Sequence, residues 1–266
     1  MAWLLAVIRR HSVDLLIPGI EIDVYQWNEH AADIERTGCR IVLNNPALTA
    51  LCRDKWHFYE ALKNHASPYA IETTLHTDFD ALAQRFGLPF LLKPRRGFGS
   101  RGIVRIADAA AFSVCRAGIG ATLMVQPIVG SDDEEFTTSA FCDGSGGFYA
   151  RMTLRRTLST EGFTDKAEVV DMADIDTAIA ELCRIFKPVG PTNFQFRKQA
   201  GALKLLEINP RISSATSIRT AFGYNEAQMA VGYYLENTVP TQPPIRRGRA
   251  VRYTEDLVFY EDRTDL

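Results

Sequence analysis

The sequence predicts an α/β fold in which a short alternation of helices and strands leads into antiparallel hairpins. The alternation is visible near the start, where the apolar run "VDLLIPGI", the helix-like "WNEHAADIERTG" and the strand-like "CRIVLNNP" follow one another. Two later strand-like stretches are interrupted by the turn signals "CDGSGG" and Ala200-Gly201, as in β-hairpins. The first pattern is typical of a doubly wound layer, and the second of an antiparallel sheet.

Composition limits the class of protein. The chain has 266 residues, of which 46% are hydrophobic and 23% charged, as in ordinary globular proteins. A formal net charge of -2 gives no argument for nucleic-acid binding. The five cysteines contain no C-x-x-C pair, which favours a reducing compartment over a disulfide framework or a zinc site. The opening run "MAWLLAVIRRHS" is too short for a membrane span. We therefore expect a cytoplasmic protein that binds neither nucleic acid nor membrane.

Two segments have clear local patterns. Residues 49–67 predict one amphipathic helix, because Leu51, Phe58 and Leu62 form an apolar stripe. Residues 159–170, "STEGFTDKAEVV", are polar and predict a loop.

A glycine-rich stretch, "LLKPRRGFGSRGIVRI", suggests a phosphate-binding loop. Glycines allow the backbone to approach a ligand closely, exposed N–H groups can hold phosphate oxygens, and Lys93 would add a positive charge. It is neither a P-loop nor a dinucleotide-binding fingerprint, because the element that follows is a strand. By itself, the stretch favours the alternative, a glycine-rich hairpin that carries surface arginines.

The second hairpin carries a candidate metal site. In "LKLLEINPR", Glu207, Asn209 and Arg211 occupy alternate positions, and a turn near Gly201 would place Gln195 opposite Glu207. One carboxylate and two amide oxygens suit Mg²⁺, which keeps waters and takes phosphate oxygens from its substrate. Arg211 would bind a phosphate or a carboxylate. The alternative is a solvated strand end.

These motifs together resemble the ATP-grasp superfamily, and most closely its branch similar to the ATP-binding domain of the carbamoyl-phosphate synthetase large subunit. The motifs occur in the family's order and are "RDKWHFYEAL", "LLKPRRGFGSRG", "MVQPIVGSDDEEFTTSAF", "TNFQFR" and "LLEINPR". The resemblance implies an α/β (α+β) ATP-grasp fold, with two α+β subdomains that grip ATP. A shortened Rossmann-like pre-ATP-grasp layer would occupy residues 1–48. The ATP-grasp domain would occupy 49–266, with a small lid subdomain over about 68–128 and a larger subdomain with the metal site over 129–266.

The resemblance also implies roles for individual residues. Catalysis would involve Arg211, which holds the transferred phosphate and the acyl intermediate, and Lys93. Two Mg²⁺ ions would be held by Gln195, Glu207 and Asn209. Contacts to ATP would come from a larger set, with Glu135 on the ribose: Lys55, Lys93, Gly97, Phe98, Gly99, Ser100, Gly102, Gln126, Pro127, Ile128, Glu135 and Lys166.

These residues imply an ATP- and Mg²⁺-dependent ligase that joins a small-molecule carboxylate to an amine through an acyl phosphate. Phosphoryl transfer depends on placed positive charge more than on covalent protein chemistry, which agrees with this set of residues. Two alternatives stay open, namely an enzyme that phosphorylates a carbamate or carboxylate without ligation, and a non-catalytic ATP-binding partner subunit. The short N-terminal layer also leaves open a homodimer that completes it.

Overall fold

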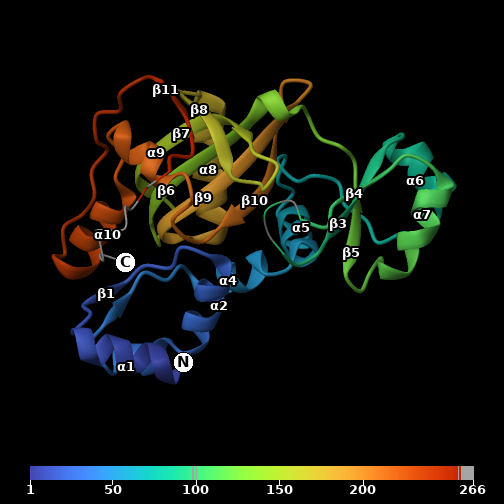
Figure 1. Cartoon of the computed structure of the whole chain (residues 1–266). Coiled ribbons are helices and arrows are strands. Elements are labelled where there is room, and N and C mark those ends of the chain that lie inside the picture. The colour runs from blue at the N-terminus through green and yellow to red at the C-terminus, as the bar shows by residue number, and fades with distance from the viewer. Residues whose placement is uncertain (98, 100, 257, 259–266) are drawn as a thin grey trace.

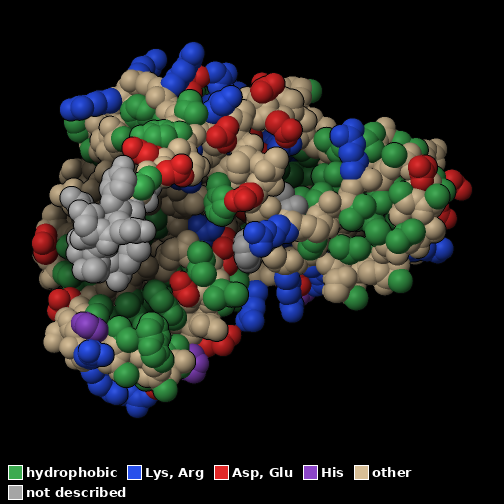
Figure 2. Space-filling view, viewed as in Figure 1, with side chains coloured by type: hydrophobic (Ala, Val, Ile, Leu, Met, Phe, Trp, Pro, Cys, Tyr) green, Lys and Arg blue, Asp and Glu red, His purple; other side chains and the backbone are tan. Residues whose placement is uncertain are grey.

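The computed structural model describes residues 1–97, 99, 101–256 and 258, and the strands of this part of the chain form three sheets. A two-stranded sheet near the N-terminus, a three-stranded sheet and a six-stranded sheet follow one another along the chain (Figure 1). Acidic and basic side chains are interspersed over the face seen in Figure 2, in line with the small net charge. No helix in the described residues is long and apolar enough to cross a membrane.

The N-terminal part contains two short parallel strands and three helices. Strands β1 (Leu15–Leu16) and β2 (Arg40–Ile41) pair in parallel, and α2 (Glu21–Glu29) and α3 (Ala31–Glu35) connect them. Helix α1 (Ala2–His11) packs on the same small core. The α/β alternation expected from the sequence is therefore present, whereas the Rossmann-like character of this layer and the domain boundaries stay predictions.

The single helix expected over residues 49–67 is wrong, because the chain forms α4 (Pro46–Cys52) and α5 (Lys55–Asn64) instead. The break falls at Asp54, whose carboxylate caps α5 by accepting the Trp56 N–H at 3.0 Å. The same carboxylate pairs with Arg95 at 2.9 Å, and the N–H of Lys55 donates to the Arg95 carbonyl at 2.8 Å. These contacts fix the start of α5, and with it Lys55, beside the end of the strand that carries Lys93.

The three-stranded sheet is antiparallel, in the order β4-β3-β5. Its strands and covering helices are α6 (Phe79–Phe86), β3 (Phe90–Pro94), β4 (Val104–Ile106), α7 (Ala109–Cys115) and β5 (Leu123–Gln126). A short 3₁₀ helix, η1 (Arg116–Gly118), follows α7. The pairing of β3 with β4 confirms the strand–glycine loop–strand arrangement predicted from "LLKPRRGFGSRGIVRI".

The six-stranded sheet has the order β10-β9-β6-β7-β8-β11, and all neighbours are antiparallel. Its strands are β6 (Glu135–Asp143), β7 (Phe148–Leu158), β8 (Thr164–Val170), β9 (Val189–Gln199), β10 (Ala202–Asn209) and β11 (Arg249–Val251). The 3₁₀ helix η2 (Asp132–Glu134) precedes β6. Strand β8 begins inside the stretch expected to be a loop, so that expectation is wrong for residues 164–170; pairing with β7 overrides the polar composition.

The two faces of the large sheet differ in chemistry because strand side chains alternate. One face packs Phe136, Phe194 and Phe196 against α8 (Ala173–Phe186) in the main hydrophobic core. The opposite face is covered in part by α9 (Thr216–Ala221) and α10 (Glu226–Leu235), and it carries Glu135 and Gln195. The polar residues of the predicted site therefore lie on the face that is not filled by α8.

A β-bulge in β10 places Glu207 on this polar face. The register between β10 and β9 shifts between Leu205 and Glu207, so Leu206 is an extra residue. Without the bulge, Leu203, Leu205 and Glu207 would share a face, and the carboxylate would enter the apolar core. Because of the bulge, the odd-numbered residues in the first half of β10 point into the apolar core, and those in the second half point to the polar face.

Candidate nucleotide-binding site

A cavity of about 360 Å³ lies beside the polar face of the six-stranded sheet. Its walls come from the N-terminal part, the start of α5, the three-stranded sheet and the large sheet. Most of the residues predicted from the sequence line it: Lys55, Lys93, Gly97, Gly99, Gln126, Pro127, Ile128, Glu135, Gln195, Glu207 and Arg211. Asn209 lines the smaller adjoining cavity, which shares Glu207 and Lys55 with the larger one.

Gly97 and Gly99, which lie between β3 and β4, line the cavity. Gly97, Gly99 and Gly102 have positive φ angles of 121°, 64° and 75°, which non-glycine residues rarely adopt. The Nζ of Lys55 donates to the Gly97 carbonyl at 2.5 Å. A Cβ atom at Gly162, in the β7–β8 connection, would lie only 2.8 Å from the Gly99 carbonyl oxygen. The two connections therefore touch across the cavity, and both need glycine there.

The charges in the cavity influence one another. Burial lowers the pKa of Lys93 to about 8, although the nearby Glu207 carboxylate partly offsets this effect. Burial raises the pKa of the Glu207 carboxyl, but the positive charges of Lys55 and Lys93 outweigh it and lower the pKa below its usual value. Glu207 is therefore ionised near neutral pH, and Lys93 is close to its titration point.

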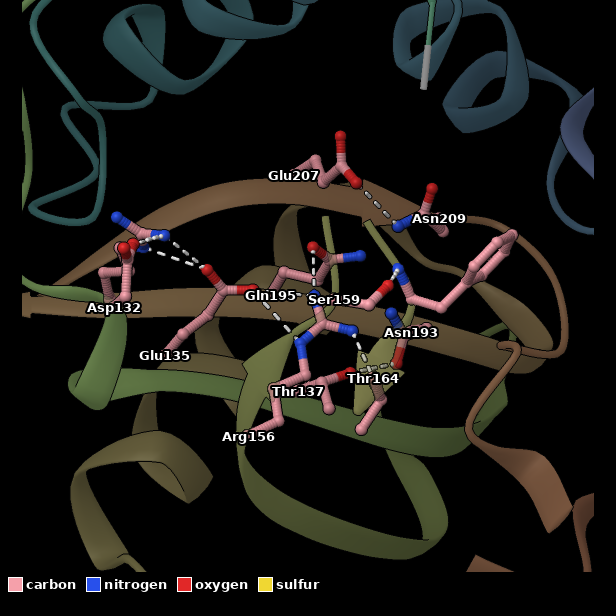
Figure 3. Close-up of polar contacts among 12 residues, drawn as sticks. Asp132, Glu135, Thr137, Arg156, Ser159, Thr164, Asn193, Gln195, Glu207 and Asn209 are labelled. Atoms are coloured by element: carbon pink, nitrogen blue, oxygen red, sulfur yellow. Dashed lines mark hydrogen bonds and ion pairs between the residues drawn. The ribbon is translucent and has the colours of Figure 1, made fainter. Parts of the chain in front are cut away.

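Glu135 is held between two arginines. Nε and Nη2 of Arg156 donate to its Oε1 at 3.1 and 2.8 Å, and Nε and Nη2 of Arg197 donate to its Oε2 at 2.9 and 2.8 Å (Figure 3). The carboxylate is only 3% exposed. Its predicted contact with a ribose stays a prediction, and the structure places both its oxygens on guanidinium groups.

The predicted metal ligands come from adjacent strands. Gln195 of β9 is paired with Glu207 of β10, which confirms the hairpin register expected from the sequence. The amide nitrogen of Asn209 donates to Glu207 Oε1 at 3.2 Å, and Figure 3 shows the oxygens of both residues on the same side of β10. The Gln195 Oε1, in contrast, accepts from Arg156 Nη2 at 2.8 Å.

This donor set fits one Mg²⁺ ion at Glu207 and Asn209, because it offers an ionised carboxylate beside an amide oxygen. The described residues contain no group of three or more His, Cys, Asp or Glu side chains that could hold a metal by themselves. Further ligands would have to come from a nucleotide and from water, as is usual for Mg²⁺.

Arg211 lies between the large sheet and the N-terminal part. Its Nη2 is paired with the Glu21 carboxylate at the start of α2, and its Nη1 donates to the Ile212 carbonyl at 2.9 Å. Its Nε is buried and has no hydrogen-bond partner among the described residues. Arg211 also lines the cavity, and an arginine in that position is suited to bind an anion.

The last residue of β5 begins a segment of three predicted ATP contacts. Gln126 is buried, and its Nε2 donates to Thr73 Oγ1 at 2.8 Å. Pro127 and Ile128 follow it along the cavity wall. All three predicted contacts therefore line the cavity.

Four predicted residues remain: two lie outside the cavity lining, and two fall outside the described residues. Lys166 is exposed and is not among the residues that line the cavity. The next residue, Ala167, packs in the core under α9, so the Lys166 side chain lies on the other face of β8. Gly102 lies outside the cavity lining, against Pro94. Phe98 and Ser100 fall outside the described residues.

Sequence reasoning missed two contributions to the site. It assigned no role to Glu21, which no motif marks and which only the fold brings to Arg211. It also assigned no role to Arg156, which contacts Glu135 and Gln195. A signal was present for Arg156, since Met152, Leu154 and Arg156 occupy alternate positions of β7 and therefore share a face of the strand.

A buried polar network supports the floor of the site. Arg219 is 0% exposed and donates to Asn193 Oδ1 at 3.0 Å and to Thr137 Oγ1 at 3.1 Å. Its charge is compensated by the fully buried Glu226, 3.7 Å away. Asn193 lies on the cavity wall, so this pair fixes the wall from behind.

The fold and the site define a class of nucleotide-binding protein. Residues 121–257, slightly more than half of the chain, match the family model described as "ATP-grasp in the biosynthetic pathway with Ter operon", so the chain belongs to the ATP-grasp family. The resemblance recognised from the five motifs is thereby confirmed.

A curated relative comes from the carbamoyl-phosphate synthetase branch that the motifs resemble. The chain is 25% identical over 197 residues to the carbamoyl phosphate synthase large chain of Acidobacterium capsulatum. The match covers 69% of this chain but only 18% of that relative.

Solved structures confirm the fold. The chain is similar to a β-γ-ATP complex of biotin carboxylase from Campylobacter jejuni, with a TM-score of 0.72, 16% identity and coverage of 92% of this chain and 60% of the other. It is also similar to N5-carboxyaminoimidazole synthetase from Staphylococcus aureus complexed with ADP, with a TM-score of 0.67, 15% identity and coverage of 87% and 63%. At these identities the likeness shows the ATP-grasp fold, and the chain spans less than two thirds of either protein.

Proposed function

We propose that this protein is an ATP- and Mg²⁺-dependent ligase that joins a small-molecule carboxylate to an amine. The observation that supports this proposal best is the convergence, in one cavity, of Lys55, Lys93, an ionised Glu207 and Arg211 beneath a glycine-containing connection. The named relatives support it as well, since a carbamoyl phosphate synthase, a biotin carboxylase and an N5-carboxyaminoimidazole synthetase are among them.

In this proposal the positive groups bind the nucleotide. Lys55 and Lys93 contact the phosphates, while the main chain of residues 126–128 borders the adenine. Glu207 and Asn209 would hold Mg²⁺, which neutralises phosphate charge when bound. The glycine-containing connection excludes water from the phosphates, which limits hydrolysis.

The reaction would run in two balanced steps. An oxygen of the substrate carboxylate attacks the γ-phosphorus, and the bond to the β-phosphate oxygen breaks, which gives an acyl phosphate and ADP. The nitrogen of the amine then attacks the acyl carbon, phosphate leaves, and the nitrogen loses a proton. Arg211 would bind the acyl phosphate, because it lines the cavity and the charge of its guanidinium matches the new anion.

The two alternatives differ in what they release. An enzyme that phosphorylates a carboxylate or carbamate without ligation would release ADP with the acid alone. A non-catalytic ATP-binding subunit would bind nucleotide and release no ADP.

The test is a screen for ADP release with amino acids, sugar acids and amines, each acid with and without amine. The proposal expects an acid that raises ADP release only when an amine is present. Nucleotide binding without ADP release across the whole panel would contradict it and favour the binding subunit.

The partners, location and oligomeric state of the protein are also proposals. Small-molecule partners, the absence of nucleic-acid and membrane partners, and a cytoplasmic location are all consistent with a ligase of this kind. A homodimer has one parallel, in that a 2-oxoglutarate carboxylase domain of Hydrogenobacter thermophilus, with a TM-score of 0.71, was solved as a dimer.

A further inference from the structure

Arg156 contacts the side-chain oxygen of Gln195, one of the three predicted metal ligands. It is 7% exposed, lines the cavity and donates to Glu135 Oε1, to Gln195 Oε1 and, through Nη1, to Thr164 Oγ1 at 3.3 Å (Figure 3). Its guanidinium therefore bridges two side chains of the polar sheet face rather than extending into solvent.

The strand register fixes this position. Glu135 of β6 has Arg156 of β7 as its partner on one side and Arg197 of β9 on the other. Thr137, the next β6 residue on this face, is opposite Gln195. Arg156 reaches across β6 to the Gln195 amide, so the contact is set by the order β9-β6-β7 and does not depend on a loop.

The same contacts occupy the Gln195 oxygen, the predicted ligand for a second ion, and the carboxylate oxygens of the adjacent Glu135. Each oxygen of Glu135 is held by a guanidinium group. Gln195 carries no charge, and its oxygen points to Arg156 at 2.8 Å. A divalent ion on that oxygen would lie one ligand away from a guanidinium and would have to share the Glu207 carboxylate with the first ion. Glu207, by contrast, accepts a hydrogen bond from the neutral Asn209.

We infer that the site takes a single divalent ion, on Glu207 and Asn209, and that the Arg156 guanidinium is a permanent positive charge at the place of a second ion. The inference rests on the proposed Mg²⁺-nucleotide site and replaces the two ions expected from the sequence. A fixed arginine needs no binding equilibrium, so that part of the positive charge would be independent of the Mg²⁺ concentration.

Gln195 and Arg156 act together in this arrangement. A glutamate at position 195 would pair with Arg156 and would remain unavailable to a metal as long as that arginine is present. The second ion is therefore expected only when the arginine is removed and a carboxylate is introduced, which is a condition on two residues that a single substitution does not meet.

The test counts bound ions directly, with Mn²⁺ as the probe. The full-length protein is saturated with a non-hydrolysable ATP analogue, and free Mn²⁺ is measured by electron paramagnetic resonance during a titration. We expect one bound Mn²⁺ per nucleotide complex for the wild type and for Gln195→Glu. We expect two for the double variant Arg156→Gln with Gln195→Glu, together with spin–spin broadening of the bound signal.

Arg155, the residue adjacent to Arg156, provides a matched control. Arg155→Gln removes the adjacent arginine, which lies about half exposed on the other side of β7 and pairs with Glu168, and its count should stay at one. Two Mn²⁺ ions in the wild type would overturn the inference, and so would a folded double variant that still takes one. If the double variant does not fold, the wild-type count decides alone. If the wild-type protein does not bind the ATP analogue at all, the proposed function itself is wrong.

Discussion

The ammonium group of Lys93 should determine how nucleotide affinity changes with pH. Burial lowers its pKa from 10.5 to about 8, so the free protein loses this positive charge as the pH rises through 8. Binding of phosphates requires the charged form. At pH 9 roughly one lysine in ten is protonated, so the affinity should be about tenfold lower than at pH 7, or about 1.4 kcal/mol.

Neighbouring groups do not produce the same profile. Nucleotide phosphates complete their ionisation near pH 6, below this window. Burial raises the pKa of the nearby Cys52 thiol and of Tyr25, so neither titrates between pH 7 and 9. Lys93→Arg keeps a positive charge throughout, because arginine is not deprotonated in proteins.

The assay is isothermal titration calorimetry of an ATP analogue with Mg²⁺ at several pH values between 7 and 9.5. The wild type should lose affinity with a slope that approaches tenfold per pH unit above 8 and should take up about one proton on binding. Lys93→Arg should have a flat profile. Equal slopes for wild type and Lys93→Arg would refute the role given to Lys93.

Three further substitutions test other parts of the site. Glu207→Gln should raise the Mg²⁺ concentration needed for half-maximal nucleotide binding by about tenfold or more. An unchanged Mg²⁺ titration would contradict the metal assignment. Gly162→Ala should lower nucleotide affinity, since its Cβ would meet the Gly99 carbonyl oxygen at 2.8 Å; unchanged affinity would show that the two connections need not touch. Arg219→Ala should lower the free energy of unfolding in urea by about 3–5 kcal/mol because Glu226 would be buried without its partner, whereas Arg219→Met with Glu226→Gln should lose less. Equal losses for these last two proteins would exclude the charge pair as the cause.

The sequence alone supports a large part of this account. The alternation of polar side chains and the turn at Ala200-Gly201 are local signals, and they correctly predict that Gln195 is opposite Glu207. The glycine-rich stretch likewise predicts two strands around a connection, and β3 and β4 are those strands. Short-range patterns are sufficient in these places because the partners are close in sequence.

Other features depend on contacts between distant segments. The bulge at Leu206 resolves a conflict between the apolar and polar halves of β10, and alternation alone gives no position for it. The break between α4 and α5 arises because Asp54 pairs with Arg95, far along the chain. The pairing of Arg211 with Glu21 similarly requires the tertiary fold.

The central claim is that this cavity activates a carboxylate by phosphorylation, and hydroxylamine trapping tests it most directly. The protein is incubated with Mg²⁺-ATP, hydroxylamine and the acid found in the screen, and hydroxamate and ADP are measured together. We predict equal amounts of the two products from the wild type and little of either from Arg211→Ala. ADP release without hydroxamate, or an Arg211→Ala protein as active as the wild type, would contradict the account.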